Sequence, residues 1–173
     1  MNVDPATLEI VHFPAPILRQ KARTVDPKDE NVRAVAQRMI ELMHESEGIG
    51  LAAPQVGLDW RIFVLAGLEE DEPDLVCINP SLTITIPEVT MREEGCLSLP
   101  GIHVDVRRPD GVQLDAHDIE GDPFTISDRG FRARVWQHEY DHLEGKLIID
   151  RMSPMAKIAT RRALKELKAA YRE

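Results

Sequence analysis

The chain has 173 residues, of which 43% are apolar, so it is long enough for one domain with a substantial buried core, and we predict that residues 1–173 form a single domain. Its net charge of −9 argues against a general nucleic-acid binder and against specific DNA binding. It contains no apolar run of about 18 residues, and its first residues lack the basic cluster and long apolar block of a secretory signal. We therefore predict a cytoplasmic protein that does not enter the membrane.

The first third of the chain predicts a loop followed by one amphipathic helix. Residues 8–23 contain two prolines, which favours a loop with a short helix. Residues 26–27, Asp-Pro, are typical of a helix start, and apolar residues recur at helical spacing over about 28–46. The sequence Glu-Gly-Ile-Gly at 47–50 is expected to end this helix, with a glycine in the left-handed position.

The middle of the chain predicts short strands, and the end predicts two helices. Strands are expected at 60–66, 75–78, 82–86, 104–107, 112–116 and 124–126, separated by turn residues, which favours antiparallel pairing. Ser127 or Asp128 is expected to cap a helix that runs to about Glu144, before Gly145. A last helix starts at Pro154, with Ile158, Leu164 and Leu167 as its packing stripe. The predicted fold class is α+β, with short antiparallel sheets around a central helix and a C-terminal helix.

Residues 138–142, His-Glu-Tyr-Asp-His, carry the strongest chemical signal in the chain. Residues four apart lie on one helix face, so the rings of His138 and His142 can reach one metal ion, with the Glu139 carboxylate beside it as a proton acceptor. Phe131 and Val135 extend the same stripe, so this face is also expected to pack inward. The alternative is a buried helix that carries two ordinary histidines.

A catalytic site with two histidines needs a third protein ligand. Glu166 is one candidate by its distance along the chain, but its lysine neighbours favour a surface ion pair. Cys96 is the better candidate because Gly95 allows close approach and a thiolate binds zinc or iron strongly. Cys96 could instead be a structural cysteine or a nucleophile with a histidine base. Cys77 lies in an apolar run and is expected to be a small buried side chain, although a single disulfide is arithmetically possible.

Residues 48–57 form a third unusual segment, small and apolar, with Gln55 as its one polar side chain. The segment lacks the lysine that follows a phosphate-binding loop. A backbone with so few side chains can pair with an extended peptide, and the Gln55 N–H can face an oxygen that becomes negative during attack on a carbonyl. A tight turn with a surface glutamine is an equally good explanation of this segment alone.

Together, the three segments resemble the peptide deformylase family. That family has a glycine-rich stretch ending Leu-Ala-Ala-Pro-Gln, then Glu-Gly-Cys-Leu-Ser, then Gln-His-Glu-x-Asp-His-Leu. Here these motifs occupy residues 48–55, 94–98 and 137–143, in the same order, and the resemblance spans about residues 8–155. It implies an enzyme that removes the N-formyl group from the formyl-methionine of newly made polypeptides and releases formate.

The resemblance also implies roles for individual residues. Cys96, His138 and His142 would bind one divalent metal, with iron(II) as the native ion and zinc, nickel or cobalt able to replace it. Glu139 would act as general base and then general acid while metal-activated water attacks the formyl carbon. Gln55 and the Leu97 N–H would stabilise the oxyanion. Peptide pairing would involve Gly50, and the methionine pocket would involve Ile49, Glu94, Val135 and the ring of His138.

Two features concern contacts outside the reaction centre. Residues 153–173 carry six basic and two acidic side chains, a net charge of +4 that leaves −13 for the rest of the chain. Some family members dock near the ribosomal exit tunnel through such a basic helix, so the ribosome is a predicted partner; an ordinary solvated helix face is the alternative. His103 stands where certain deformylases carry an arginine, which leaves its part in substrate binding open.

Two other functions compete with deformylation. A metallopeptidase would use His138, His142 and Glu166 as its metal ligands. A non-catalytic homologue would bind formylated or other peptides without turnover, although the presence of Glu139 and Gln55 argues against it.

Overall fold

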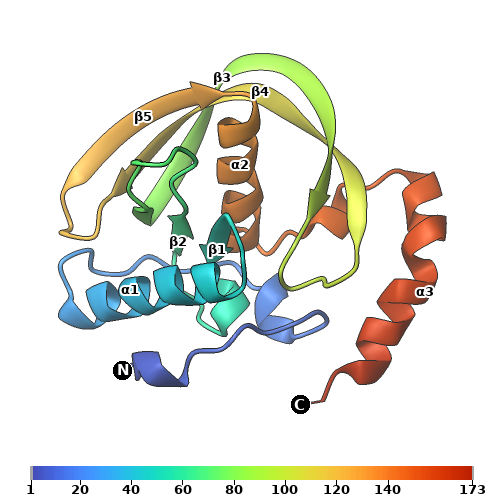
Figure 1. The fold of residues 1–173 in the computed structure, drawn as a ribbon, viewed down its shortest axis with the longest axis horizontal. Helices are drawn as coiled ribbons and strands as arrows, with labels where there is room; N and C mark the ends of the chain where they lie inside the picture. The colour runs from blue at the N-terminus through green and yellow to red at the C-terminus, as the bar shows by residue number, and fades with distance from the viewer. Residues whose placement is uncertain (1, 173) are drawn as a thin grey trace.

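The fold is α+β, with antiparallel strands curved around a central helix and a separate C-terminal helix (Figure 1). The computed structural model describes residues 2–172; Met1 and Glu173, the two ends of the predicted domain, lie outside this range. No helix among the described residues is both long and apolar enough to cross a membrane. The helices are α1 Glu30–Glu45, α2 Phe131–Leu143 and α3 Pro154–Ala170, with short 3-10 turns at Pro5–Thr7, Pro16–Arg19, Ala53–Val56 and Ile148–Asp150.

Five antiparallel strands form one sheet in the order β1-β2-β3-β4-β5. Their bounds are β1 Gly50–Ala52, β2 Ile62–Leu65, β3 Leu75–Gly95, β4 His103–His117 and β5 Pro123–Arg129. The expected strands at 75–78 and 82–86 are parts of β3, and those at 104–107 and 112–116 are parts of β4. Their separation was wrong because Pro80 lies within β3 and residues 109–111, Pro-Asp-Gly, lie within β4, in both cases next to a register shift in the β3–β4 pairing. Proline is tolerated at such irregular positions.

Helix α1 packs its apolar side against β1 and β2, with Val35, Ala36, Met39 and Met43 fully buried. The prediction that a glycine occupies the left-handed position at the end of this helix was wrong. The left-handed residue is Glu47, at φ 56°, while the Gly48 N–H donates to the Met43 carbonyl over 2.8 Å, which is a Schellman ending. Gly48 serves a different purpose, because a Cβ there would lie 2.9 Å from Cδ1 of Leu97.

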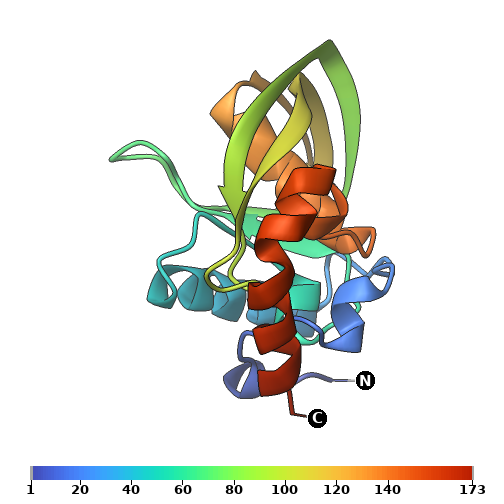
Figure 2. The same cartoon turned by 90° about the vertical axis from the view of Figure 1, so that its right-hand side faces the viewer.

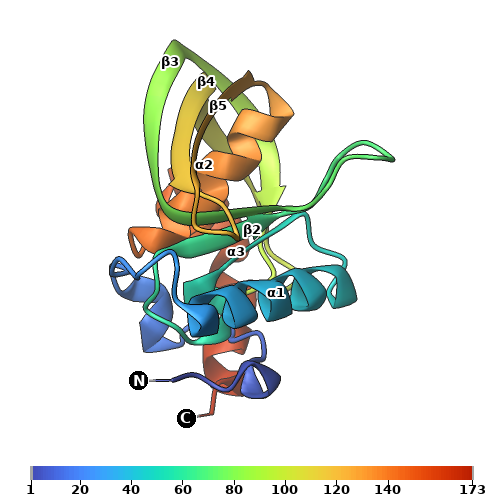
Figure 3. The ribbon, with the colours of Figure 1, turned by 90° about the vertical axis from the view of Figure 1, so that its left-hand side faces the viewer.

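Helix α2 lies inside the curve of β3, β4 and β5 (Figures 1 and 3). Its predicted cap at Ser127 or Asp128 was wrong: both residues belong to β5, and Gly130, at φ 69°, precedes the helix. Strand alternation continues to Arg129 because that stretch pairs with Gly111–Gln113 of β4. The helix ends at Leu143, and the predicted glycine, Gly145, follows two residues later in the left-handed region, at φ 70°.

Helix α3 lies along one side of the molecule, and the β2–β3 loop projects from another (Figure 2). The Ser153 hydroxyl caps α3 by accepting from the Ala156 N–H at 3.1 Å. Leu164 and Leu167 pack on the core as predicted, but Ile158 is 74% exposed and does not belong to the packing stripe. Ala156, two residues earlier, packs on the core instead, because the face of α3 that meets the core begins there.

Candidate metal centre

Cys96, His138 and His142, the three metal ligands that the family resemblance implied, lie close together in the structure. Their donor atoms all lie within 4.8 Å of one another, and the Cys96 Sγ lies 3.4 Å from the His142 Nε2. A tetrahedral ion with these ligands needs donors about 3–4 Å apart, so the three residues can converge on one ion with small adjustments. Both cysteines are free among the described residues, and Cys77 is fully buried, so the possible disulfide does not form.

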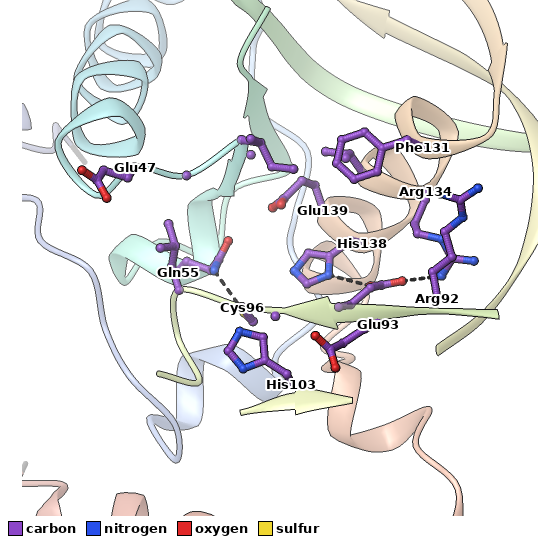
Figure 4. Close-up of a pocket in the computed structure, with 17 residues that line it drawn as sticks. Glu47, Gln55, Arg92, Glu93, Cys96, His103, Phe131, Arg134, His138 and Glu139 are labelled. Carbon is purple, nitrogen blue, oxygen red and sulfur yellow. Dashed lines mark hydrogen bonds and ion pairs between the residues drawn. The ribbon is translucent and has the colours of Figure 1, made fainter. Parts of the chain in front are cut away.

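Two backbone contacts fix the turn that presents Cys96. The Leu99 N–H donates to the Cys96 carbonyl at 3.0 Å, and the Phe13 N–H donates to the Ser98 carbonyl at 2.8 Å. The second contact ties the turn to the N-terminal segment. The sulfur is thus held at the end of β3, opposite His138 of α2 (Figure 4).

Glu94 orients the ring of His138. Its carboxylate lies 2.9 Å from the His138 Nδ1, which leaves the Nε2 of that ring for an ion. Burial alone would lower the pKa of His138, but the hydrogen bonds with Cys96 and Glu94 outweigh it and raise this pKa to about 10. The surroundings therefore favour positive charge at this point, which suits a metal cation.

The surroundings of His142 shift its pKa in the opposite direction to that of His138. It is 1% exposed, and burial, together with the positive charges of His138 and Arg108, holds its pKa well below the usual range. A neutral imidazole is the form that binds metal. The donor set of one thiol and two imidazoles thus fits a divalent ion, and the chemistry of the set suits iron, zinc, nickel and cobalt alike.

Glu139 is 3% exposed, and no described residue makes a hydrogen bond to its Oε2. Burial raises its pKa to about 7 against the opposing charges of His138 and Arg108. The carboxylate lies against the backbone of Gly50, where an added Cβ would come within 2.6 Å of the Glu139 Oε1. Gly50 is therefore required by this close approach.

Gln55 is buried and held at both ends of its amide group. The Oε1 accepts from the Ala52 N–H at 2.9 Å, and the Nε2 donates to the Ser98 hydroxyl at 3.3 Å and contacts the Cys96 sulfur at 3.5 Å. The N–H side of the amide therefore faces the metal centre. No backbone hydrogen bond of residues 2–172 uses the Leu97 N–H. Gln55 and Leu97, the two residues expected to supply the oxyanion donors, both line the pocket next to the metal centre.

A pocket of about 610 Å³ opens onto this centre between residues 47–50 and residues 92–97 (Figure 4). Every predicted site residue except the deeper His142 lines it. Ile49 and Phe131 remain 43% and 48% exposed, so the apolar stripe of α2 reaches the surface at Phe131 instead of packing inward. Four charged residues line the pocket without a predicted role, Glu47, Arg92, Glu93 and Arg134, and His103, whose part was left open, also lines it.

Arg134 could have been found from the sequence, since it lies one helical turn before His138. Arg108 could not, because nothing near it in the chain marks it as buried. Glu166 lies on α3, where it is 66% exposed and accepts from the Arg162 Nε at 2.9 Å. The predicted surface ion pair is confirmed for that residue, and the metal-donor cluster of the described residues does not include it.

Comparison with known sequences identifies the same family that the site motifs resemble. Residues 7–158 match the family described as polypeptide deformylase. The peptide deformylase of Thermotoga maritima is 40% identical over 155 residues, which cover 90% of this chain and 93% of that protein. Peptide deformylase 1B of Arabidopsis thaliana, named as chloroplastic/mitochondrial, is 42% identical over 96% of this chain. This chain spans 62% of the length of that plant relative.

Solved structures agree with the fold. A crystal structure of Arabidopsis thaliana peptide deformylase 1B with an inhibitor superimposes with a TM-score of 0.88 at 42% identity, covering 95% of this chain and 92% of that chain. The Plasmodium falciparum peptide deformylase, also with an inhibitor, superimposes with a TM-score of 0.85 at 39% identity, covering 93% of this chain and 99% of that chain.

Proposed function

This chain belongs to the peptide deformylase family, and from that premise we propose that it hydrolyses the N-formyl group of formyl-methionyl polypeptides and releases formate. One observation carries the proposal. The donors Cys96 and His138, the carboxylate of Glu139 and the N–H side of Gln55 all line one pocket, and the third donor, His142, lies deeper, next to Cys96.

We assign the reaction to the side chains as follows. An ion held by Cys96, His138 and His142 would lower the pKa of a water molecule and polarise a carbonyl group. Glu139 would take a proton from that water and return it to the leaving amine. The Gln55 Nε2–H and the Leu97 N–H would donate to the oxygen of the formyl group as it becomes negative.

The pocket supports a peptide with a long apolar first side chain. Ile49, Val135 and the ring of His138 would contact the methionine side chain, with Glu94 behind the ring. Gly50, at the free edge of β1, would pair with the peptide backbone. The substrate backbone would then bind as an extra strand between β1 and the end of β3.

Three further points remain predictions. We propose iron(II) as the native ion, with zinc, nickel or cobalt as replacements, because one thiol and two imidazoles suit all four. We propose the ribosome as a partner through the basic helix α3. We also propose a cytoplasmic location, whereas the plant relatives are named as chloroplastic or chloroplastic/mitochondrial proteins.

The test of this function is Glu139→Ala. Because Glu139 is not among the three metal donors, the variant should keep one metal per chain and lose nearly all turnover of formyl-Met-Ala. Metal content is measured after anaerobic purification, and formate release is measured at saturating peptide. Wild-type rates in the variant would exclude the assigned role, and a wild-type chain that binds metal and formyl peptide without turnover would favour the non-catalytic peptide binder.

A second pair of variants separates this function from a metallopeptidase. Cys96→Ala should lose the metal and Glu166→Ala should keep it. The reverse result would favour the metallopeptidase.

A further inference from the structure

Arg108 is a buried cation that the proposed reaction does not use. It lies on β4, is 2% exposed, and does not line the main pocket. An arginine buried this deeply is stable only if its charge and its donors are satisfied. Two carboxylates do this, one at the end of β3 and one on α2.

The first carboxylate is Glu94, which binds Arg108 through two parallel contacts. The Arg108 Nε donates to Oε2 at 2.7 Å, and the Nη2 donates to Oε1 at 2.8 Å. The same Oε1 lies 2.9 Å from the Nδ1 of His138. The guanidinium therefore fixes the carboxylate that fixes the first imidazole.

The second carboxylate is Asp141, the residue immediately before His142. The Arg108 Nη1 donates to its Oδ2 at 2.9 Å. His142 follows Asp141 on the same turn of α2. The contact with Arg108 therefore holds this turn of the helix in place, and with it the side chain of His142. Among the described residues, Arg108 alone bonds both carboxylates: Arg134 reaches only Glu94, and Arg151 reaches only Asp141.

We propose that Arg108 is a positioning residue that places both histidine donors for the metal ion, an inference that rests on the proposed metal centre. The guanidinium is a rigid planar fork, so one side chain holds two acceptors at fixed directions. A lysine keeps the charge but replaces the fork with a single point of attachment. Partners of metal-binding histidines commonly affect metal affinity about 10–100-fold when they are removed.

The test uses Co²⁺ with Arg108→Lys and, as matched control, Arg132→Lys. Arg132 lies on α2, and its ion pairs are with Glu72 and Asp128, outside the network. The dissociation constant for Co²⁺ is measured by competition with a chelating dye, and the absorption bands of bound Co²⁺ report the ligand geometry. Arg108→Lys should raise the dissociation constant about 10–100-fold and shift the bands, and Arg132→Lys should change it less than about threefold.

Thermal unfolding without metal separates positioning from folding. If Arg108→Lys lowers the melting temperature but leaves the Co²⁺ affinity and the bands as in Arg132→Lys, the inference is overturned.

If Arg108→Lys does not fold, Asp141→Asn replaces it, with Arg151→Lys as its control. A raised dissociation constant in Asp141→Asn alone supports the inference, and equal constants overturn it. Failure of the wild-type chain to bind Co²⁺ would instead overturn the proposed metal centre itself.

Discussion

At the scale of single residues, Gln55 shows how one amide group acquires a fixed direction. The Ala52 N–H occupies its oxygen, so its nitrogen must face the sulfur of Cys96 and the pocket. Gln55→Glu keeps an acceptor for Ala52 and removes the donor. We expect kcat for formyl-Met-Ala to fall about 10²–10³-fold, the usual cost of one oxyanion donor. Ser98→Ala is the control, because it removes a partner of Gln55 but leaves the donor in place. An unchanged kcat in Gln55→Glu would exclude the oxyanion role.

Gly50 gives a second prediction at this scale. A methyl group there would lie 2.6 Å from the Glu139 Oε1, so Gly50→Ala must displace the carboxylate or the strand. A displacement of about 1 Å in a reacting group costs on the order of 10²-fold in rate. We expect that loss in kcat with the metal content retained, measured by formate release and metal analysis. A variant with normal kcat would show that the carboxylate has room to move without loss.

Site residues could be predicted from the sequence where a motif within one segment marks them, but not where they depend on contacts between distant segments. His138 and His142 are one helical turn apart, and Cys96 stands in an unusual glycine-containing stretch, so these three could be predicted. Arg108 finds its partners 14 and 33 residues away. Only the pairing of β4 with β3, and of α2 with both, brings those groups together. No spacing rule within one segment could reveal that.

At the scale of secondary structure elements, helices were predicted more accurately than strands. Helix α1 lies within two residues of its expected ends, because its apolar spacing has one clear period. Strand β3 was divided at its prolines, because a proline inside a predicted strand normally ends it. The start of α2 was misplaced because Ser127 and Asp128 resemble helix caps, while their pairing with β4 depends on a distant strand.

Helix α3 carries the prediction about the ribosome. Its Arg161, Arg162 and Lys165 are exposed, and Arg162 bonds only the exposed Glu166. Changing all three to Glu should weaken co-sedimentation with ribosomes and leave kcat on short formyl peptides unchanged. The control carries the same charge change on other exposed residues, Lys28, Arg107 and Lys146. Equal co-sedimentation of the two variants would remove α3 as the docking element.

At the scale of the whole molecule, the metal donors connect parts of the chain that fold together only in the native state. Cys96 follows β3, and both histidines lie on α2, so an ion bound at this point stabilises the pairing of these parts. Free ion at about 1,000 times its dissociation constant should raise the free energy of unfolding by about 4 kcal/mol. Urea unfolding with and without Co²⁺ measures this gain. Cys96→Ala should abolish the difference, and an equal gain in that variant would place the ion elsewhere.

If a substrate binds as proposed, between the free edge of β1 and the end of β3, this binding mode also limits when it can react. A substrate peptide held by main-chain contacts to both strands must have an extended N-terminus whose backbone is not yet hydrogen-bonded. A protein whose first residues have already joined its own sheet or helix cannot offer one. Deformylation would then have to occur before the substrate protein folds. Proteins whose N-termini are buried in the folded state would depend most on early deformylation.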